Sequence, residues 1–394
     1  MKIWFILMQF PAPREVFANN DVEMLKRYGD DISVHSLRPK HKLYLKLIKE
    51  RDLSALKHSH SNFSSNIHGL LYGFNNFMKL SKILTFIITN HCSHFTHLMK
   101  SLVLVPRVLH LFSKFENDRP EIVHLYWAHY PSLFGYLVKC YYPSTILSMN
   151  FVAYDLHQRY KGSFIVARMA DYVFSITKFD KNTLVNLGIP EDKIHIIYHG
   201  LLPEVFEKET PSKIKGRIVS VGAFIPGKKM LDVIKAFALI CQQHPEVSLI
   251  LFGDGPLKTK AEKLVFDLNL QNVVFKGHVS NKDVIEQLYS AEILLFLSNN
   301  ERLPNVVKEA MSQKCACVIA DTAGIRELIE SNGYGTVLKE NSLEDAKLAV
   351  CRYLENETLR SKVSDNAYDH VVKYFNVEKN IRKMRKIWLK DKNI

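Results

Sequence analysis

Short apolar runs alternate along the chain with longer segments in which apolar residues recur at helical spacing. Runs that are apolar throughout are typical of strands buried on both faces of a parallel sheet, and the amphipathic segments between them are typical of covering helices. The pattern predicts an α/β chain with strands at residues 2–9, 32–37, 121–126, 144–151, 217–221, 247–252, 293–297, 316–320 and 335–338.

Two domains are expected, because 394 residues with 47% hydrophobic content exceed what one core comfortably holds. Residues 203–216 turn polar and charged, which predicts the linker between a domain at 1–202 and a domain at 217–375.

Basic charge is concentrated in residues 36–115, which hold 12 Lys and Arg against 2 Asp and Glu, so that +10 of the net charge of +13 lies there. No nucleic-acid-binding motif accompanies the charge, which therefore favours an anionic membrane surface or a phosphate-bearing substrate over nucleic acid. The region is expected to form a mostly helical insert. Its later basic residues edge apolar positions: Lys79, Lys82, Lys100, Arg107 and Lys114. Helices lying on a bilayer or framing a lipid groove fit this pattern, and so do core-facing helices with solvated lysines.

The chain is expected in the cytoplasm, peripheral at the inner face of the membrane. It has no apolar run of about 20 residues that would span a bilayer, and its first residues do not resemble a cleaved signal peptide. The six cysteines are scattered without a C-x-x-C pair, and Cys315 and Cys317 are interpreted as small core residues.

Metal and dinucleotide sites are not expected. His91, His94 and His97 lack carboxylate or cysteine partners, and no D-x-D motif stands in a plausible loop. The Gly253–Pro256 turn begins like a dinucleotide motif but lacks its continuation.

Two glutamates mark the most informative stretch, residues 298–327. Glu301 follows the strand at 293–297, and Pro304 stands where a helix would begin, which places Glu309 on that helix. Eight helical steps span at most about 12 Å, on the order of the reach from a ribose to a sugar carried on its diphosphate. Two carboxylates at this spacing can hold the two polyol ends of one ligand, with the helix N-terminus facing the diphosphate.

The strings ERLPNVVKEAM and VIADTAGIRE, the latter ending at Glu327, resemble the family-four retaining glycosyltransferases. The resemblance implies a GT-B fold, with two Rossmann-like domains facing a central cleft, the acceptor in the first and the donor in the second. It assigns Glu301 to the donor sugar and Glu309 to the ribose hydroxyls. The segment 376–394 resembles the family's last helix, which returns to the first domain.

The same resemblance implies further donor contacts. Lys228 matches the family's phosphate-binding lysine, and the loop at Val279 matches the one that lies against the base. The full donor set is Gly222, Lys228, Lys229, Gly253, Gly255, Val279, Glu301, Arg302, Leu303, Pro304 and Glu309.

Several positions depart from the family pattern. Ala223 replaces an arginine, while Arg302, Lys229 and Ala323 replace glycines. Arg302 either contacts the donor phosphates or crowds a loop that needs glycine's freedom. We hypothesise that it supplies the charge missing at Ala223.

In the first domain, Val152 stands where the family has a histidine facing the donor sugar. Asp155 is then the predicted catalytic residue beside Glu301 and Lys228, with His129 or His157 helping to place the groups. Alternatively, Asp155 caps a helix or pairs with Arg159. In the loop after residue 9, Arg14 and Glu15 face a ligand or form a solvated pair.

The resemblance implies transfer of a hexose from a nucleotide diphosphate sugar, with UDP favoured over GDP, to a saccharide acceptor, with retention of anomeric configuration. A lipid-linked acceptor in bacterial surface polysaccharide synthesis fits the basic insert. No cofactor or metal is expected. The alternatives are a transferase with a soluble acceptor and a catalytically inactive homologue that binds a membrane or a partner enzyme.

Overall fold

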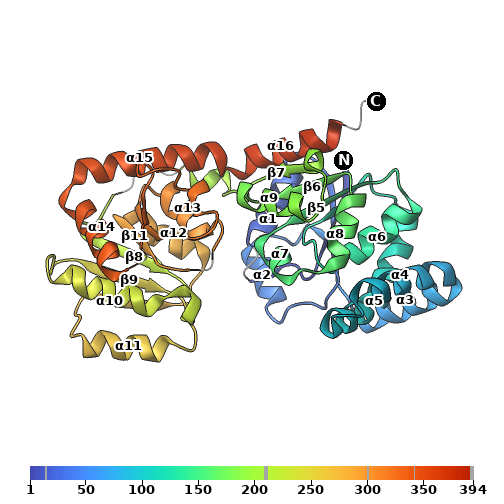
Figure 1. Cartoon of the computed structure of the whole chain (residues 1–394), viewed down its shortest axis with the longest axis horizontal. Helices are drawn as coiled ribbons and strands as arrows, with labels where there is room; N and C mark the ends of the chain where they lie inside the picture. The colour runs from blue at the N-terminus through green and yellow to red at the C-terminus, as the bar shows by residue number, and fades with distance from the viewer. Residues whose placement is uncertain (14–15, 208–211, 300, 341, 391–394) are drawn as a thin grey trace. The chain divides into compact units, whose positions relative to one another are not determined.

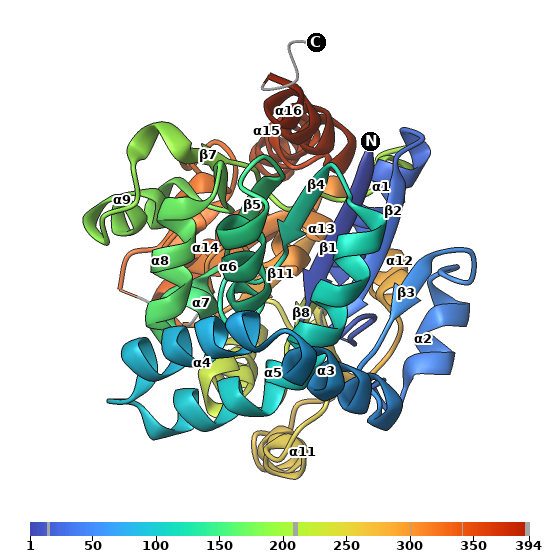
Figure 2. The ribbon, with the colours of Figure 1, turned by 90° about the vertical axis from the view of Figure 1, so that its right-hand side faces the viewer.

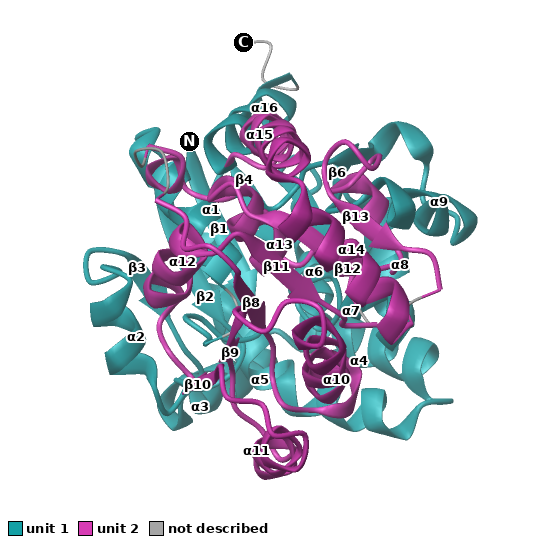
Figure 3. Ribbon diagram, turned by 90° about the vertical axis from the view of Figure 1, so that its left-hand side faces the viewer, with its two compact units in different colours: residues 1–200, 377–394 teal, residues 201–376 magenta. Residues whose placement is uncertain are grey.

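The computed structural model describes residues 1–13, 16–207, 212–299, 301–340 and 342–390. Arg14 and Glu15, two of the predicted ligand-facing residues, lie outside this part of the chain. The chain divides into two compact units (Figures 1 and 3). Unit 1 consists of Met1–Gly200 and the segment from Val377 onward, and unit 2 consists of Leu201–Asn376.

Unit 1 is built on a seven-stranded parallel sheet in the order β3-β2-β1-β4-β5-β6-β7. The strands are β1 (Lys2–Leu7), β2 (Asp31–Ser36), β3 (Lys57–Ser59), β4 (Ile122–Leu125), β5 (Ile146–Phe151), β6 (Tyr172–Ser175) and β7 (Ile194–Ile196). The helices are α1 (Val16–Arg27), α2 (Tyr44–Glu50), α3 (Phe63–Asn75), α4 (Phe77–His91), α5 (Phe95–Asp118), α6 (Ser132–Tyr141), α7 (Ala153–Gln158), α8 (Lys161–Met169), α9 (Lys178–Asn186), η1 (Glu191–Lys193) and α16 (Val377–Lys390).

Unit 2 is built on a six-stranded parallel sheet in the order β10-β9-β8-β11-β12-β13. The strands are β8 (Arg217–Val221), β9 (Ser248–Phe252), β10 (Val273–Gly277), β11 (Ile293–Phe296), β12 (Ala316–Ala320) and β13 (Thr336–Leu338). The helices are η2 (Pro203–Val205), η3 (Pro226–Lys228), α10 (Met230–Cys241), α11 (Lys258–Asp267), α12 (Asn281–Ser290), α13 (Asn305–Ser312), η4 (Ile325–Glu327), α14 (Leu343–Glu355) and α15 (Glu357–Tyr374).

Both sheets reverse their direction of growth once, between β1 and β4 in unit 1 and between β8 and β11 in unit 2. At such a switch point the loops after the two strands diverge and leave a crevice at the carboxyl edge, where ligands bind in open α/β sheets. The predicted α/β fold class is therefore confirmed, and each unit has one topologically defined place for a ligand.

Each unit has its own apolar core, as the hydrophobic runs predict. In unit 1 the core includes Ile6, Leu125 and Met149 from adjacent strands, and in unit 2 it includes Leu249 and Leu295. Cys315 and Cys317 are buried in unit 2, as interpreted from the sequence.

The segment 203–216, predicted as a linker, packs on unit 2 where the structure describes it. It contains η2, and Lys213 Nζ donates to the carbonyl oxygen of Gln313 at 2.6 Å.

The basic insert forms α2, β3, α3, α4 and α5, with α3 and α4 packed beside α5 (Figure 2). A Cβ on Gly69 of α3 would lie 1.8 Å from the carbonyl oxygen of Pro106 in α5, so the contact between the two helices requires glycine there. Within the described residues, none of the helices combines the length and hydropathy needed to cross a bilayer.

Candidate functional site

Lys228 and Glu301 meet at the switch point of unit 2. Lys228 ends η3, in the connection that follows β8, and Glu301 lies in the loop after β11. Their side chains form an ion pair between Nζ and Oε1, and Ser298 Oγ donates a hydrogen bond to the same carboxylate oxygen at 3.3 Å. Two residues separated by 73 positions are thus brought together because β8 and β11 are neighbours in the sheet.

The loops after β8, β9 and β10 form a continuous backbone platform beside this pair. The N–H of Gly222 donates to the carbonyl of Phe252 at 2.9 Å, and that of Gly253 to the carbonyl of Gly277 at 2.8 Å. A Cβ on Gly253 would lie 1.9 Å from the carbonyl oxygen of Gly222, and one on Gly255 would lie 2.7 Å from that of Phe224. Both glycines also have positive φ, so the close approach of the loops depends on them. Val279 follows on the loop after β10.

Glu309 lies on α13, one turn into the helix, and is only 6% exposed. Its Oε1 accepts a hydrogen bond from Nδ2 of Asn281, the first residue of α12, at 2.8 Å. Burial raises the pKa of the Glu309 carboxyl, while the bond from Asn281 and the charge of Lys308 oppose the rise. A buried carboxylate with one amide donor has remaining capacity to accept hydrogen bonds from ligand hydroxyls.

The loop from Arg302 to Pro304 connects the two glutamates. Pro304 is the N-cap of α13, one residue before the helix proper, and Leu303 is half-buried. Arg302 does not adopt a positive φ, so the backbone conformation at this position does not require glycine. Lys229, by contrast, has φ of 50° and lies in the left-handed region, which a glycine adopts more easily than a lysine.

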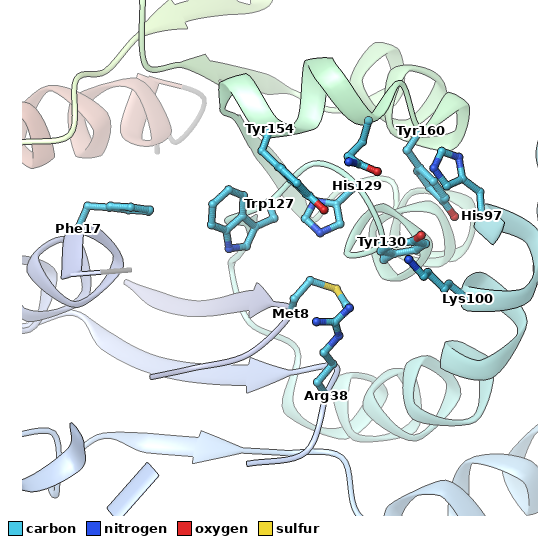
Figure 4. Close-up of a pocket in the computed structure, with 11 residues that line it drawn as sticks. Met8, Phe17, Arg38, His97, Lys100, Trp127, His129, Tyr130, Tyr154 and Tyr160 are labelled. Carbon is cyan, nitrogen blue, oxygen red and sulfur yellow. The ribbon is translucent and has the colours of Figure 1, made fainter. Parts of the chain in front are cut away.

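The switch point of unit 1 carries a cavity of about 390 Å³, which we call the aromatic pocket (Figure 4). It receives residues from the ends of β1, β2 and β4, from α1, from the α7 region and from α5 of the insert. They are Met8, Phe17, Arg38, His97, Lys100, Trp127, His129, Tyr130, Tyr154, Gln158 and Tyr160. Aromatic faces with a few cationic groups suit a ligand that carries hydroxyl groups and negative charge.

Asp155 lies beneath this pocket and is fully buried. Its Oδ1 pairs with Nδ1 of His129 at 2.6 Å and its Oδ2 accepts from the N–H of Val152, the N-cap of α7, at 3.1 Å. The capping alternative is thus realised, and the carboxylate also orients the His129 ring that lines the pocket. Asp155 is placed to position a histidine and does not itself line the cavity.

The structure therefore brings together Lys228 and Glu301 in unit 2, and Asp155 and His129 in unit 1. His97 lines the aromatic pocket, and the described residues contain no group of three or more His, Cys, Asp or Glu placed to hold a metal ion. Sequence reasoning missed Asn281 and the pocket residues Trp127, Tyr130 and Tyr154. The motif YWAHY at 126–130, an aromatic cluster directly after an apolar strand, was the signal available for two of these three.

Residues 203–370 match the model of the family described as glycosyl transferases group 1. The chain is 28% identical over 227 residues to the poly(glycerol-phosphate) alpha-glucosyltransferase of Bacillus subtilis, which covers 56% of this chain and 33% of that protein. It is 27% identical over 203 residues to a Campylobacter jejuni enzyme, the N-acetylgalactosamine-N,N'-diacetylbacillosaminyl-diphospho-undecaprenol 4-alpha-N-acetylgalactosaminyltransferase, with coverage of 50% and 54%. The chain thus spans about half or less of these curated relatives.

Among solved structures, Anabaena HepE in complex with UDP aligns with a TM-score of 0.73 at 14% identity and covers 98% of this chain and 99% of that one. At this identity the likeness shows the fold, and it extends over both units. Residues 203–370 therefore resemble the group 1 glycosyl transferases, within a chain that has the GT-B fold.

Proposed function

We propose that the chain is a retaining glycosyltransferase that moves a hexose from a nucleotide diphosphate sugar to a saccharide acceptor in bacterial surface polysaccharide synthesis. The observation that carries this proposal is the Lys228–Glu301 pair at the switch point of a group 1 domain. A lysine beside a backbone platform suits a diphosphate, and a carboxylate beside it suits the hydroxyls of the attached sugar.

The proposed donor contacts follow the order of the loops. Glu309 holds the ribose hydroxyls, backbone groups at Val279 lie along the base, and Glu301 approaches the sugar. Lys228, with Lys229 at the start of α10, neutralises the diphosphate as it leaves. UDP is the favoured nucleotide, and the occupant named for the Anabaena structure supports that choice.

In the structure, Lys228 is paired with Glu301. Donor binding would replace this internal partner by phosphate oxygens, which leaves the Glu301 carboxylate open to the sugar. In a retaining transfer of this kind, the acceptor hydroxyl attacks from the face of the leaving diphosphate, which takes up its proton. Charge stabilisation of the diphosphate then matters more than a strong protein base.

The aromatic pocket of unit 1 is the proposed acceptor site. Trp127 and Tyr154 offer ring faces to a sugar, while Arg38 and Lys100 offer charge to a diphosphate. A neighbouring cavity of about 420 Å³ shares Arg38 and Lys100 and is otherwise mostly apolar, with Leu37, Met99, Val103 and Leu104 in its lining. The saccharide would lie against the aromatic rings, the diphosphate beside Arg38 and Lys100, and the lipid in the neighbouring apolar cavity. The acceptor named for the Campylobacter relative, a diphospho-undecaprenol saccharide, has this composition.

Peripheral attachment to the inner face of the membrane is proposed through the insert. Phe63, Phe74, Phe77, Met78 and Phe95 are each at least 70% exposed on α3, α4 and α5. Such side chains, with the basic excess of the insert, suit the interface of an anionic bilayer.

The deciding experiment is sugar transfer from radiolabelled nucleotide sugars to a short lipid diphosphate saccharide. Wild type is compared with Lys228→Gln and with Lys235→Gln, an exposed lysine on α10. We expect transfer by wild type and Lys235→Gln and a loss of at least about 100-fold in Lys228→Gln. Equal background rates in all three proteins would instead support a catalytically inactive homologue.

A further inference from the structure

A second cavity of unit 1 lies on the far part of α5, where the chain leaves β2 and β3 and enters α3. It has a volume of about 530 Å³, and none of its lining residues is shared with the aromatic pocket. Pro39, Ser61 and Arg107 also line the neighbouring cavity of about 420 Å³, so the two cavities adjoin at Arg107. Basic and hydroxyl or amide side chains dominate its lining, which contains no carboxylate. The lining residues are Pro39, Lys40, His58, Ser59, His60, Ser61, Asn62, Ser65, Arg107, His110 and Lys114, and we call this cavity the basic pocket.

Arg107 is the strongest evidence that the pocket is built for a ligand. Its side chain is buried, with 2% of the residue exposed. Nε donates to the carbonyl oxygen of Ser36 at 3.0 Å and one terminal nitrogen donates to Ser59 Oγ at 2.8 Å. Both partners are neutral, and within the described residues no carboxylate forms an ion pair with this guanidinium. Burying a charge without a counter-ion is costly, so an anion in the cavity would supply the missing compensation.

His60 provides a second, independent observation. It is 9% exposed, and neither of its ring nitrogens has a hydrogen-bond partner among the described residues. Nδ1 of His110 is likewise buried, with no hydrogen-bond partner in the part of the chain that the structure describes. Burial lowers the pKa of both histidines to about 4, with smaller contributions from neighbouring cationic groups that include Arg107. At neutral pH each ring is therefore uncharged and has one N–H to donate.

The start of α3 adds partial positive charge at the same place. Asn62 and Ser65 form a capping box at this helix, whose N-terminal end carries partial positive charge. Lys40 and Lys114 are exposed and add two further charges at the rim. The positive charge of these groups is larger than a single carboxylate would neutralise. It matches a ligand group that carries several negative charges and several acceptor oxygens.

We propose that the basic pocket binds a phosphoryl group, either free diphosphate or the head group of an anionic lipid, at a site distinct from the aromatic pocket. The pocket is large enough for such a group with its substituent.

The test compares wild type with a double variant at the rim, Lys40→Gln/Lys114→Gln, which leaves the buried Arg107 in place. The control is Lys46→Gln/Lys49→Gln, which removes the same charge from exposed positions of α2 in the same insert. Calorimetric titration with inorganic diphosphate measures binding. Lys228→Gln is titrated in parallel, so that binding at the donor site is recognised by its loss in that protein.

We expect the rim variant to bind diphosphate at the basic pocket at least tenfold more weakly than wild type. Binding at this pocket should be unchanged in the α2 control, and it should also be unchanged in Lys228→Gln, which loses only the binding at the donor site. Flotation with vesicles that contain or lack phosphatidylglycerol then identifies the source of the group. Loss of vesicle binding in the rim variant alone supports a lipid head group, and retained vesicle binding supports a soluble phosphoryl ligand. Equal diphosphate affinity in wild type and the rim variant, or an equal loss in the α2 control, would overturn the proposal.

Discussion

Glu309 holds its carboxylate in a buried position with one hydrogen bond from a described neighbour, Asn281. A charge in such a place lowers the stability of the empty protein, because water would solvate it better. Ribose hydroxyls would restore the lost hydrogen bonds. Stability and donor binding are therefore expected to respond in opposite directions when the charge is removed.

Glu309→Gln is predicted to raise the free energy of unfolding of the empty protein by about 1 kcal/mol at pH 7.5, and to weaken nucleoside diphosphate binding about tenfold or more. Because burial raises the pKa of Glu309, the charge penalty is complete above that raised value and absent below the ordinary value of 4.5. The advantage of the Gln variant should thus shrink as the pH falls toward 4.5. Urea unfolding across pH and calorimetry measure the two effects, and an equal stability difference at pH 7.5 and 4.5 would contradict the assignment.

Substitutions of Glu301 and Lys228 are predicted to have different effects on kcat and on nucleotide binding, although the two residues form one ion pair. Glu301→Gln removes negative charge beside the diphosphate, so nucleoside diphosphate binding should be unchanged or slightly tighter while kcat falls about 100-fold or more. Lys228→Gln should lower both. Parallel measurements of kcat, KM and nucleotide affinity check this, and weakened nucleotide binding in Glu301→Gln would argue against its placement at the sugar.

Site residues that lie inside a short sequence motif could be predicted, whereas residues brought in by contacts between distant segments could not. Glu301, Glu309 and Lys228 each lie in a recognisable motif that directly follows a predicted strand. Asn281 reaches Glu309 across 28 positions, and no local pattern marks it. Asp155 was selected by alignment with the family pattern, with His129 or His157 as the helping residue. The choice of His129 depends on the pairing of β4 with β5, because His129 follows β4 and Asp155 follows β5.

At the scale of elements, the backbone platform formed by the loops after β8, β9 and β10 depends on glycines for the close approach of its loops. Gly253 is the most constrained, because its absent Cβ leaves room for the carbonyl of Gly222. Nearby Gly227 has no heavy atom closer than 3.8 Å to its ideal Cβ and provides a matched comparison.

Gly253→Ala is predicted to cost about 2–3 kcal/mol of stability and to abolish the stabilisation of unit 2 by nucleoside diphosphate, since both the clash and the positive φ oppose a side chain. Gly227→Ala should change stability by less than about 1 kcal/mol and keep the ligand response. Thermal unfolding with and without UDP measures both variants. Equal loss of stability and an equal response to UDP in the two variants would show that the loops can move apart without losing the ligand site.

Most elements follow from hydrophobic pattern, and the exceptions have identifiable causes. The long apolar strands β1, β5, β9 and β12 were predicted close to their observed positions. β3 was missed because its sequence, KHS, has no apolar residue and the strand exists through pairing with β2. The insert was predicted as helical, but apolar residues on several faces of α3, α4 and α5 gave no basis for choosing which face packs inward.

At the scale of the whole molecule, the chain crosses from unit 1 to unit 2 and returns, so that α16 completes unit 1. Trp388 is fully buried there, with its ring 5.6 Å from that of His124 and 6.1 Å from that of Phe174. Arg385 also pairs with Asp30 at 2.8 Å. The last helix is therefore part of the core of the first unit.

Trp388→Ala is predicted to destabilise unit 1 by about 3–5 kcal/mol through the cavity it leaves. Lys386→Ala, at an exposed position of the same helix, should have little effect. Hydrogen exchange followed by mass spectrometry distinguishes the units: exchange should accelerate in β1, β4 and β6 and stay nearly unchanged in β8, β9 and β11. Uniform acceleration in both sheets would indicate that the units unfold as one.

The position of α16 also sets the order of events during synthesis. The strands that Trp388 covers leave the ribosome before residues 201–376 are made, and at about 5–20 residues per second the missing helix follows on the order of ten seconds later. Throughout that interval the nascent first unit exposes the apolar surface that Trp388 covers in the finished protein, because α16 has not yet been synthesised. Production of this protein is therefore expected to depend on chaperones that hold the early chain, and to suffer more from premature termination before Trp388 than from pauses inside unit 2.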